Sequence, residues 1–375
     1  MKIVIAIDSF KGSMSSLEAG FAAKKGIEKV KKDAIICVKP LADGGEGTTE
    51  ALTAGLGGEL FDVEVTGPLG GKVNASYGML EDETCVMEMA SAAGITLVDR
   101  DSLNPDKAGT YGVGEMICDA VEKGAKNFII GIGGSATTDG GTGMLRALGF
   151  RFLKADGTEI SDGIEELDQI SEIVASKKSE IVCGCNFEIA CDVENPLCGK
   201  NGAVAVFGPQ KGVDPDKIDF YDAKMRHFAK KTAEFFGVDK SEIKGTGAAG
   251  GLGFAFLSYF KNARLRPGTD IVLDAIGLRE EIKDADVVVT GEGRLDGQTA
   301  MGKVPVGVAR LAKEYNKKVV AFAGGVTEDA AKCNDCGIDA FFPIVRGVTT
   351  LDEAMDTENA KKNMSLAVEQ VFRLI

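Results

Sequence analysis

Four times along this chain, an apolar run typical of a β-strand ends in a glycine-rich loop that carries at least one acidic residue. The runs are residues 3–7, 35–38, 128–132 and 287–290. Glycine lets the backbone approach a ligand closely, and oriented amides at a strand-to-helix turn bind anions, phosphate above all. Acidic residues would repel a bare phosphate, so their presence indicates a metal ion or a hydroxyl that loses its proton. The repeated pattern therefore favours chemistry on a nucleotide phosphate.

Length and charge narrow the range of partners. A chain of 375 residues is long enough for about two domains. The formal net charge of −14 disfavours nucleic acid or an anionic membrane as a partner. A phosphate site in such a chain must take its positive field from helix N-termini, a few Lys and Arg residues, and a divalent cation.

The cysteines and apolar segments indicate a cytoplasmic protein. The nine cysteines have no disulfide-framework spacing, and the apolar run near the N-terminus is cut short at Asp8. The longest uncharged stretch, residues 245–260, is too short and too glycine-rich to span a bilayer. We expect reduced cysteines and no membrane partner; monomer and homodimer both stay open.

Alternating strands and helices at both chain ends predict an α/β fold. Residues 1–66 and 286–375 each show this rhythm, which is typical of a doubly wound, Rossmann-like parallel sheet. Because each end supplies only three short strands, the two ends are expected to form one discontinuous domain. Residues 67–285 are predicted to form a second, inserted α/β domain. The ligand is expected in a cleft between the two, since open α/β sheets bind ligands at the carboxyl ends of their strands.

Two glycine motifs are incomplete. Residues 297–303 (GQTAMGK) fit the first seven positions of a Walker A loop, but Val304 stands where Ser or Thr should follow. Lys303 is then either a phosphate contact or a solvated lysine at a helix start. Matches to G-x-G-x-x-G/A begin at Gly131 and Gly245, yet the first runs on through a polar loop instead of entering a helix at once. The alternative for these glycines is tight turns and close packing alone.

Histidine and cysteine chemistry is disfavoured. His227 is the only histidine, and Cys333 with Cys336 forms a lone C-x-x-C without a second pair. A Ser-His-Asp triad or a His-ligated metal is therefore not expected, and any general base should be a carboxylate. Asp192 follows an apolar run and precedes a proline turn, so it either projects toward a ligand as a base or caps the turn.

Arg294 and Asp296 form a second candidate pair, in the fourth glycine loop. The planar fork of an arginine suits a carboxylate or a phosphate. The alternative is an ordinary surface salt bridge.

Six segments resemble the signatures of the type 1 glycerate kinases, in family order and over almost the whole chain. They are DSFKGS (8–13), PLADGGEGT (40–48), GIGGSATTDGGTG (131–143), ACDVENPL (190–197), GAAGGLG (247–253) and GEGRLDGQT (291–299). The resemblance implies ATP-dependent phosphorylation of D-glycerate with Mg²⁺ in a cytoplasmic, two-domain enzyme with one Rossmann-like domain. It implies 2-phosphoglycerate as the product, with 3-phosphoglycerate as the alternative.

Within that reading, chemistry assigns roles to individual residues. Lys11 is expected to neutralise phosphate, Arg294 to bind the glycerate carboxylate or the transferred phosphoryl group, and Asp192 to accept the hydroxyl proton. Asp43 and Asp296 are the predicted Mg²⁺ ligands. The predicted nucleotide-binding residues are Gly133, Gly134, Ser135, Thr137, Thr138, Gly250 and Gly251. The predicted substrate-binding residues are Asp8, Ser9, Asp43, Gly44, Gly45, Arg294 and Asp296.

Two readings from other classes stay open. One is an NAD(P)-dependent oxidoreductase acting on glycerate or hydroxypyruvate, which also needs glycine loops and a carboxylate clamp. The other is a non-catalytic regulator that binds a sugar acid or a nucleotide without turnover.

Overall fold

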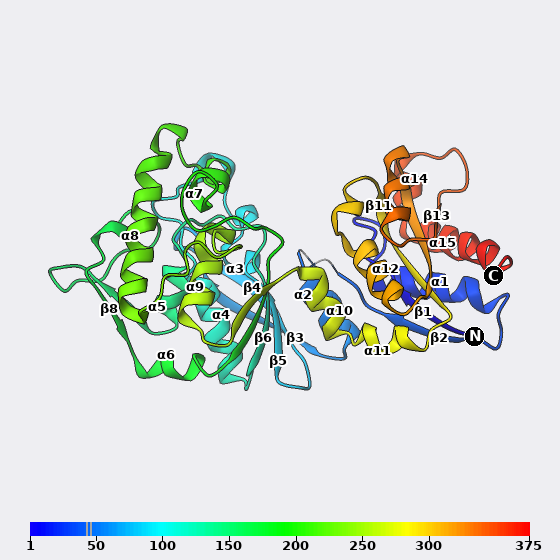
Figure 1. Cartoon of the computed structure of the whole chain (residues 1–375), viewed down its shortest axis with the longest axis horizontal. Helices are drawn as coiled ribbons and strands as arrows, with labels where there is room; N and C mark the ends of the chain where they lie inside the picture. The colour runs from blue at the N-terminus through cyan, green and yellow to red at the C-terminus, as the bar shows by residue number, and fades with distance from the viewer. Residues whose placement is uncertain (43, 46) are drawn as a thin grey trace. The chain divides into compact units, whose positions relative to one another are not determined.

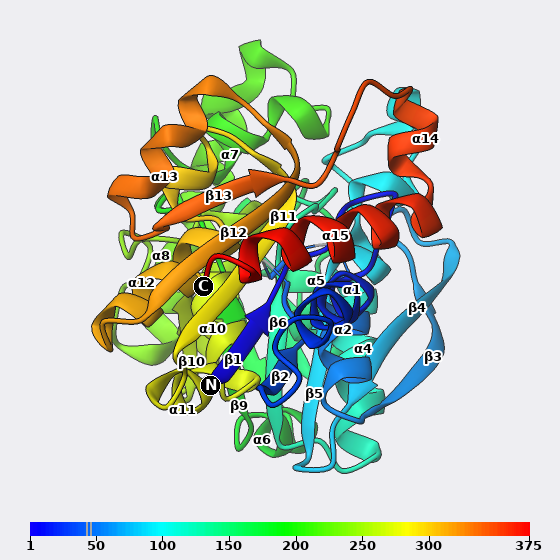
Figure 2. The same ribbon diagram turned by 90° about the vertical axis from the view of Figure 1, so that its right-hand side faces the viewer.

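The computed structural model (Figures 1 and 2) describes residues 1–42, 44–45 and 47–375. Its chain divides into two compact units. The first unit contains Met1–Asp43, Ala54–Leu56 and Thr269–Ile375, and the second contains Gly44–Thr53 and Gly57–Gly268. The first is thus assembled from both ends of the chain. The boundary predicted at residue 66 differs from this division, because strand β3 pairs within the second unit.

The sheet of the first unit has five strands in the order β13-β12-β11-β1-β2, and every neighbouring pair is parallel. The strands are β1 (Lys2–Ala6), β2 (Ile35–Lys39), β11 (Val287–Leu295), β12 (Lys318–Val326) and β13 (Ala340–Pro343). Each strand alternates with helices along the chain, as the predicted doubly wound sheet requires.

Helices cover both faces of this sheet. They are α1 (Ser16–Glu28), α10 (Gly268–Ala275), α11 (Leu278–Lys283), α12 (Val304–Glu314), α13 (Lys332–Asp335), α14 (Leu351–Met355) and α15 (Thr357–Phe372). Ile3, Ile5 and Ile7 share a core with α1 and α15, while the intervening Val4 and Ala6 are also fully buried. α12 packs against β11 and β12 but contributes nothing to that core, so it covers the opposite face (Figure 1). Burial on both faces explains the continuous apolar runs in the sequence.

The second unit contains a six-stranded mixed sheet in the order β10-β9-β6-β5-β4-β3. Its strands are β3 (Glu59–Thr66), β4 (Lys72–Met79), β5 (Thr84–Glu88), β6 (Asn127–Gly131), β9 (Asn186–Ala190) and β10 (Ala263–Arg266). The pairs from β10 to β5 are parallel, and β4 and β3 continue the sheet antiparallel. A separate hairpin pairs β7 (Phe150–Leu153) with β8 (Glu172–Ala175).

The helices of the second unit enclose an aromatic core. They are α3 (Ala90–Ala93), α4 (Tyr111–Glu122), α5 (Thr142–Ala147), α6 (Lys177–Val182), α7 (Ala203–Phe207), α8 (Ile218–Phe236) and α9 (Leu252–Tyr259); α2 (Thr48–Gly55) is divided between the units. Phe228 of α8 packs edge-on against Phe152 and Phe254, so α8 is tied to β7 and α9. Across the described ranges, the helices are all too short or too polar to traverse a lipid bilayer.

Candidate functional site

The topology of the first unit places a cavity at its switch point. From β1 the chain passes through α1 to β2 on one side, and from β11 through α12 to β12 on the other. Connections diverge at this point, and open α/β sheets bind ligands where that happens. A cavity of about 610 Å³ opens here, lined by residues that follow β1 and by the last residues of β11. We call it the β1–β11 pocket.

Two buried acidic residues, Asp8 and Glu292, line this pocket. The amide of Asp8 donates to the carbonyl of Gly291 at 2.9 Å, which places Asp8 beside Glu292. The Asp8 carboxylate accepts the amide of Ser9 at 2.7 Å, and the Glu292 carboxylate accepts the hydroxyl of Thr299. Both acids are therefore fixed in position. Glu292 has no predicted role from sequence, although it belongs to the fourth glycine loop.

Three cations line the same pocket: Lys11, Arg294 and Lys303. Arg294 Nε lies 3.7 Å from Asp296 Oδ2, and Lys303 Nζ lies 4.0 Å from Asp296 Oδ1. The carboxylate of Asp296 also accepts the amides of Gln298 and Thr299, at 2.9 and 3.2 Å. Asp296 thus orders the segment that carries Arg294 and Lys303, while the Arg294 side chain keeps 70% of its surface exposed. The structure brings Arg294 and Asp296 together, and both roles predicted for the pair, a ligand contact and a surface salt bridge, stay open.

Part of the pocket wall is apolar, and we call this part the apolar wall. It is formed by Phe10, Val304, Ile344, Leu351 and Met355. Leu351 and Met355 belong to α14 and are 75% and 38% exposed, so both can present apolar surface to a ligand. Sequence analysis missed this wall because no motif links α14 to the glycine loops.

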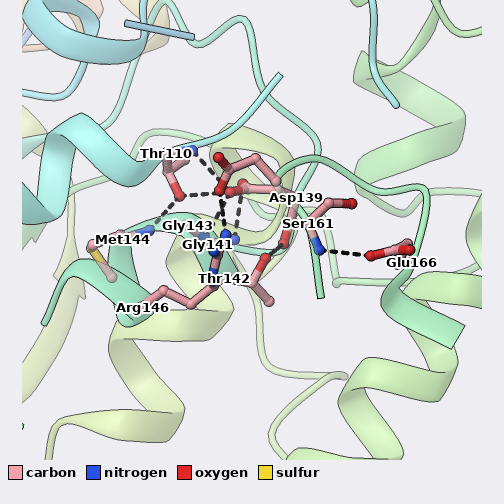
Figure 3. Close-up of polar contacts among 10 residues, drawn as sticks. Thr110, Asp139, Gly141, Thr142, Gly143, Met144, Arg146, Ser161 and Glu166 are labelled. Carbon is pink, nitrogen blue, oxygen red and sulfur yellow. Dashed lines mark hydrogen bonds and ion pairs between the residues drawn. The ribbon is translucent and has the colours of Figure 1, made fainter. Parts of the chain in front are cut away.

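In the second unit, the acidic residue of the third glycine loop is turned inward (Figure 3). The fully buried Asp139 carboxylate accepts the amide and hydroxyl of Thr110 at 2.9 and 2.7 Å, and the amides of Gly141 and Gly143 at 3.1 Å each. The Thr110 hydroxyl in turn accepts the amide of Met144 at 2.9 Å. Burial raises the pKa of Asp139, and these hydrogen bonds oppose the shift. Asp139 therefore ties the loop to the start of α4 and has no surface on which to meet a ligand.

A buried lysine supports the same loop. Lys211 Nζ donates to the Ser135 hydroxyl at 2.6 Å and to the Thr137 carbonyl at 2.8 Å. Burial lowers the pKa of Lys211 to about 7. Sequence analysis missed Lys211, because it lies in a short turn far along the chain from this loop. The predicted residues Ser135 and Thr137 are thus engaged within the protein, and the hydroxyls of Thr137 and Thr138 are buried without a hydrogen-bond partner.

Most glycines of the third loop and of the 247–253 loop pack against one another. A Cβ added to Gly250 would lie 2.1 Å from the Thr137 carbonyl oxygen, and one added to Gly251 would lie 2.8 Å from Gly140 Cα. The amide of Gly140 also donates to the carbonyl of Gly250 at 2.9 Å. Gly133 and Gly134 are different, because both are exposed and a Cβ on Gly133 would touch nothing within 4 Å. Only these two of the predicted nucleotide-binding glycines are open to a ligand.

Asp192 is the second residue beyond the carboxyl end of β9 (Asn186–Ala190). Its carboxylate accepts the amide of Gly268 at 3.0 Å. Gly44, at φ +85°, packs against the same residue: a Cβ there would lie 2.6 Å from Gly268 Cα. Gly44 and Asp192 therefore share one neighbourhood in the second unit. The predicted Mg²⁺ ligand Asp43 lies outside the described residues.

A parallel sheet with a pocket at its switch point, lined by three cationic residues, is typical of enzymes of the α/β class. The chain belongs to the glycerate kinase family, whose model matches residues 3–375, and it is a kinase. The family resemblance noted in the sequence is confirmed.

Curated and solved relatives span nearly the whole chain. It is 46% identical to the glycerate kinase of Bacillus subtilis (strain 168), covering 95% of this chain and 93% of the relative. It is also 46% identical to the glycerate 2-kinase of Escherichia coli (strain K12), covering 94% and 93%. A crystal structure described as a candidate glycerate kinase 2 from Salmonella typhimurium LT2 matches with a TM-score of 0.91 at 44% identity, covering 100% of this chain and 98% of that one.

Proposed function

We propose that this protein transfers the terminal phosphoryl group of ATP to D-glycerate, giving 2-phosphoglycerate and ADP. The observation that carries the proposal is the cluster of Lys11, Arg294 and Lys303 at the switch point of the first unit, in a chain of the glycerate kinase family. Phosphorylation at the 2-hydroxyl is favoured because a 46% identical relative is named a glycerate 2-kinase. Phosphorylation at the 3-hydroxyl is the competing outcome.

Phosphoryl transfer depends on positioning and charge neutralisation more than on covalent chemistry. Lys11 supplies positive charge to phosphate oxygens. Arg294 binds the transferred phosphoryl group or the glycerate carboxylate through its fork, which its exposed side chain can present to a ligand.

Asp192 takes the proton of the attacking hydroxyl. The only histidine, His227, has its Nε2 within 2.8 Å of the Ile170 carbonyl, on a helix of the second unit. A carboxylate is therefore the available base. The Asp192 carboxylate offers about four lone-pair positions, and the amide of Gly268 donates to one of its oxygens.

The donors around the pocket fit a magnesium ion bound mainly through nucleotide phosphates. Among the described residues there is no group of three or more His, Cys, Asp or Glu side chains arranged for a metal. Mg²⁺ commonly takes only one or two carboxylates and completes its shell with phosphate oxygens and water. Asp8 and Glu292 offer such a pair. Asp296 fits less well, because two cations and two turn amides already surround its carboxylate. Bound magnesium would neutralise phosphate charge.

One assay tests the proposal. The protein is incubated with Mg-ATP and D-glycerate, and the products are identified by phosphorus NMR, which separates 2- from 3-phosphoglycerate. The expected result is a 2-phosphoglycerate signal that grows together with ADP. Absence of any phosphoglycerate contradicts the proposal. Oxidation of NADH or NADPH by hydroxypyruvate in a parallel absorbance assay would support the oxidoreductase reading instead.

A further inference from the structure

We propose that the β1–β11 pocket binds the nucleotide, with the base against the apolar wall and the phosphates toward Lys11, Arg294 and Lys303. The inference rests on the proposed function, and it moves the nucleotide from the glycine loops of the second unit to the first unit. The volume of the pocket suits a nucleotide. A cavity of about 610 Å³ lies within the range of roughly 300–1,000 Å³ typical of sites for drug-sized ligands. A three-carbon acid would fill a small part of it.

The pocket is lined by both apolar and cationic side chains. D-glycerate carries an oxygen on every carbon, so it has no apolar surface to place against Phe10, Ile344 and Met355. A nucleoside triphosphate has one apolar, aromatic end and one anionic end. The pocket lining contains both kinds of group, the residues of the apolar wall and three cations. Exposed Leu351 and Met355 on α14 are explained if a base covers them.

The incomplete Walker A segment ends at this pocket. Lys303 is the N-cap residue of α12, a helix of 11 residues whose N-terminus carries a partial positive charge. Lys303 and Val304 both line the pocket. The segment therefore presents a lysine and a helix N-terminus to the phosphates, as a phosphate-binding loop does. Val304 has no hydroxyl for a metal, and the carboxylates of Asp8 and Glu292, which line the same pocket, would supply oxygen ligands instead.

The glycine loops of the second unit offer little open surface to a nucleotide. Gly250 and Gly251 pack against the third glycine loop, which leaves no room there for a ligand. Lys211 donates hydrogen bonds to the same loop, to the Ser135 hydroxyl and the Thr137 carbonyl. What remains open there is the short stretch at Gly133 and Gly134. That stretch offers backbone amides, but the lysine that supports the loop, Lys211, is buried and donates to Ser135 and Thr137.

Photolabelling locates the nucleotide directly. The full-length protein is irradiated with 8-azido-ADP in the absence of glycerate, and labelled peptides are mapped by mass spectrometry. The inference expects label on the segment 341–355, which carries Ile344, Leu351 and Met355, and expects unlabelled ADP to compete. Label on residues 131–143 or 247–253 would overturn it.

Calorimetric ADP binding, again without glycerate, tests individual side chains. Met355→Asp places a charge against the base, and Lys303→Met removes a phosphate contact; each should weaken ADP binding about tenfold or more. Lys318→Met is the matched control, because Lys318 is an exposed lysine at the amino end of β12, away from the pocket. Gly133→Ala, a methyl group added in open space, should leave the affinity within twofold of wild type. Leu351→Ala repeats the apolar test with a milder change if Met355→Asp lowers the melting temperature.

The outcomes separate this inference from the proposed function. If the pocket variants bind ADP normally while Gly133→Ala does not, the nucleotide binds at the third glycine loop and the inference is wrong, even when phosphoglycerate is still formed. If the label maps to the pocket but no phosphoglycerate appears, the proposed function fails and the nucleotide site stands. Wild-type protein that does not bind ADP at all overturns the inference.

Discussion

Removing the carboxylate of Asp139 should strongly destabilise the second unit. Asp139→Ala would orphan three backbone amides and one hydroxyl in a site that contains no solvent-exposed surface. A buried donor left without a partner costs about 1–3 kcal/mol. Four such groups sum to roughly 4 kcal/mol at the low end of that range, which is a large share of the stability of a typical domain, about 5–15 kcal/mol.

The cost should depend on how many donors the replacement leaves unmatched. In Asp139→Asn the amide can turn its oxygen toward Thr110 and Gly143, so that its NH₂ group opposes the amide of Gly141 alone. One unmatched pair should cost about 1–3 kcal/mol. Thr110→Val should fall in the same range, because it leaves the Met144 amide without an acceptor.

Scanning calorimetry or circular dichroism measures these changes. For a domain of this size, 1 kcal/mol shifts the melting temperature by about 2–4 °C, so Asp139→Ala should lower the transition of the second unit by roughly 8–16 °C. The double variant with Thr110→Val should lose less than the sum of the two single losses, because both act on one network. A melting temperature of Asp139→Ala within 2 °C of wild type would refute the reasoning. So would additivity of the two substitutions.

Further substitutions test the remaining assignments. Arg294→Lys should lower kcat/KM by about 10- to 150-fold, the equivalent of the 1.5–3 kcal/mol of a charge-assisted bond, while Arg310→Lys on α12 should leave it unchanged; unchanged kinetics in both would make Arg294 a surface charge. Asp192→Asn should lower turnover by about 10²–10⁴ at nearly constant melting temperature, with the exposed Glu194→Gln as its control; near-normal turnover would leave Asp192 as a turn cap. Lys211→Met should change the pH dependence of stability. The pKa of Lys211 falls from 10.5 to about 7 on folding, so between these values the unfolded chain holds a proton that the folded chain does not. Wild type should therefore gain stability relative to the variant as pH rises from about 7 toward 10, by up to about 1.4 kcal/mol per pH unit, and a difference independent of pH would contradict the shift.

Local patterns in the sequence were sufficient to predict the parallel sheet of the first unit and the family. Continuous apolar runs such as residues 287–290 reflect burial on both faces of a sheet, and this requirement acts on each strand separately. The pairing of Arg294 with Asp296 was also predictable, since the two residues are close neighbours in one loop. The apolar runs and the Arg294–Asp296 pair were predictable because each depends on residues that are close together in the sequence.

Tertiary contacts decided the rest. β3 joined the second unit because its partner β4 lies there, and alternation along β3 alone does not reveal which sheet it enters. Gly250 and Gly140 look like ligand-binding glycines until the fold presses their two loops together, since the same lack of a side chain serves a ligand or a neighbouring backbone equally well. Lys211 and the apolar wall at α14 gave no signal, because each acquires its role from groups distant in the chain. Burial of a lysine and exposure of a methionine are properties of the packed structure, and no local pattern encodes them.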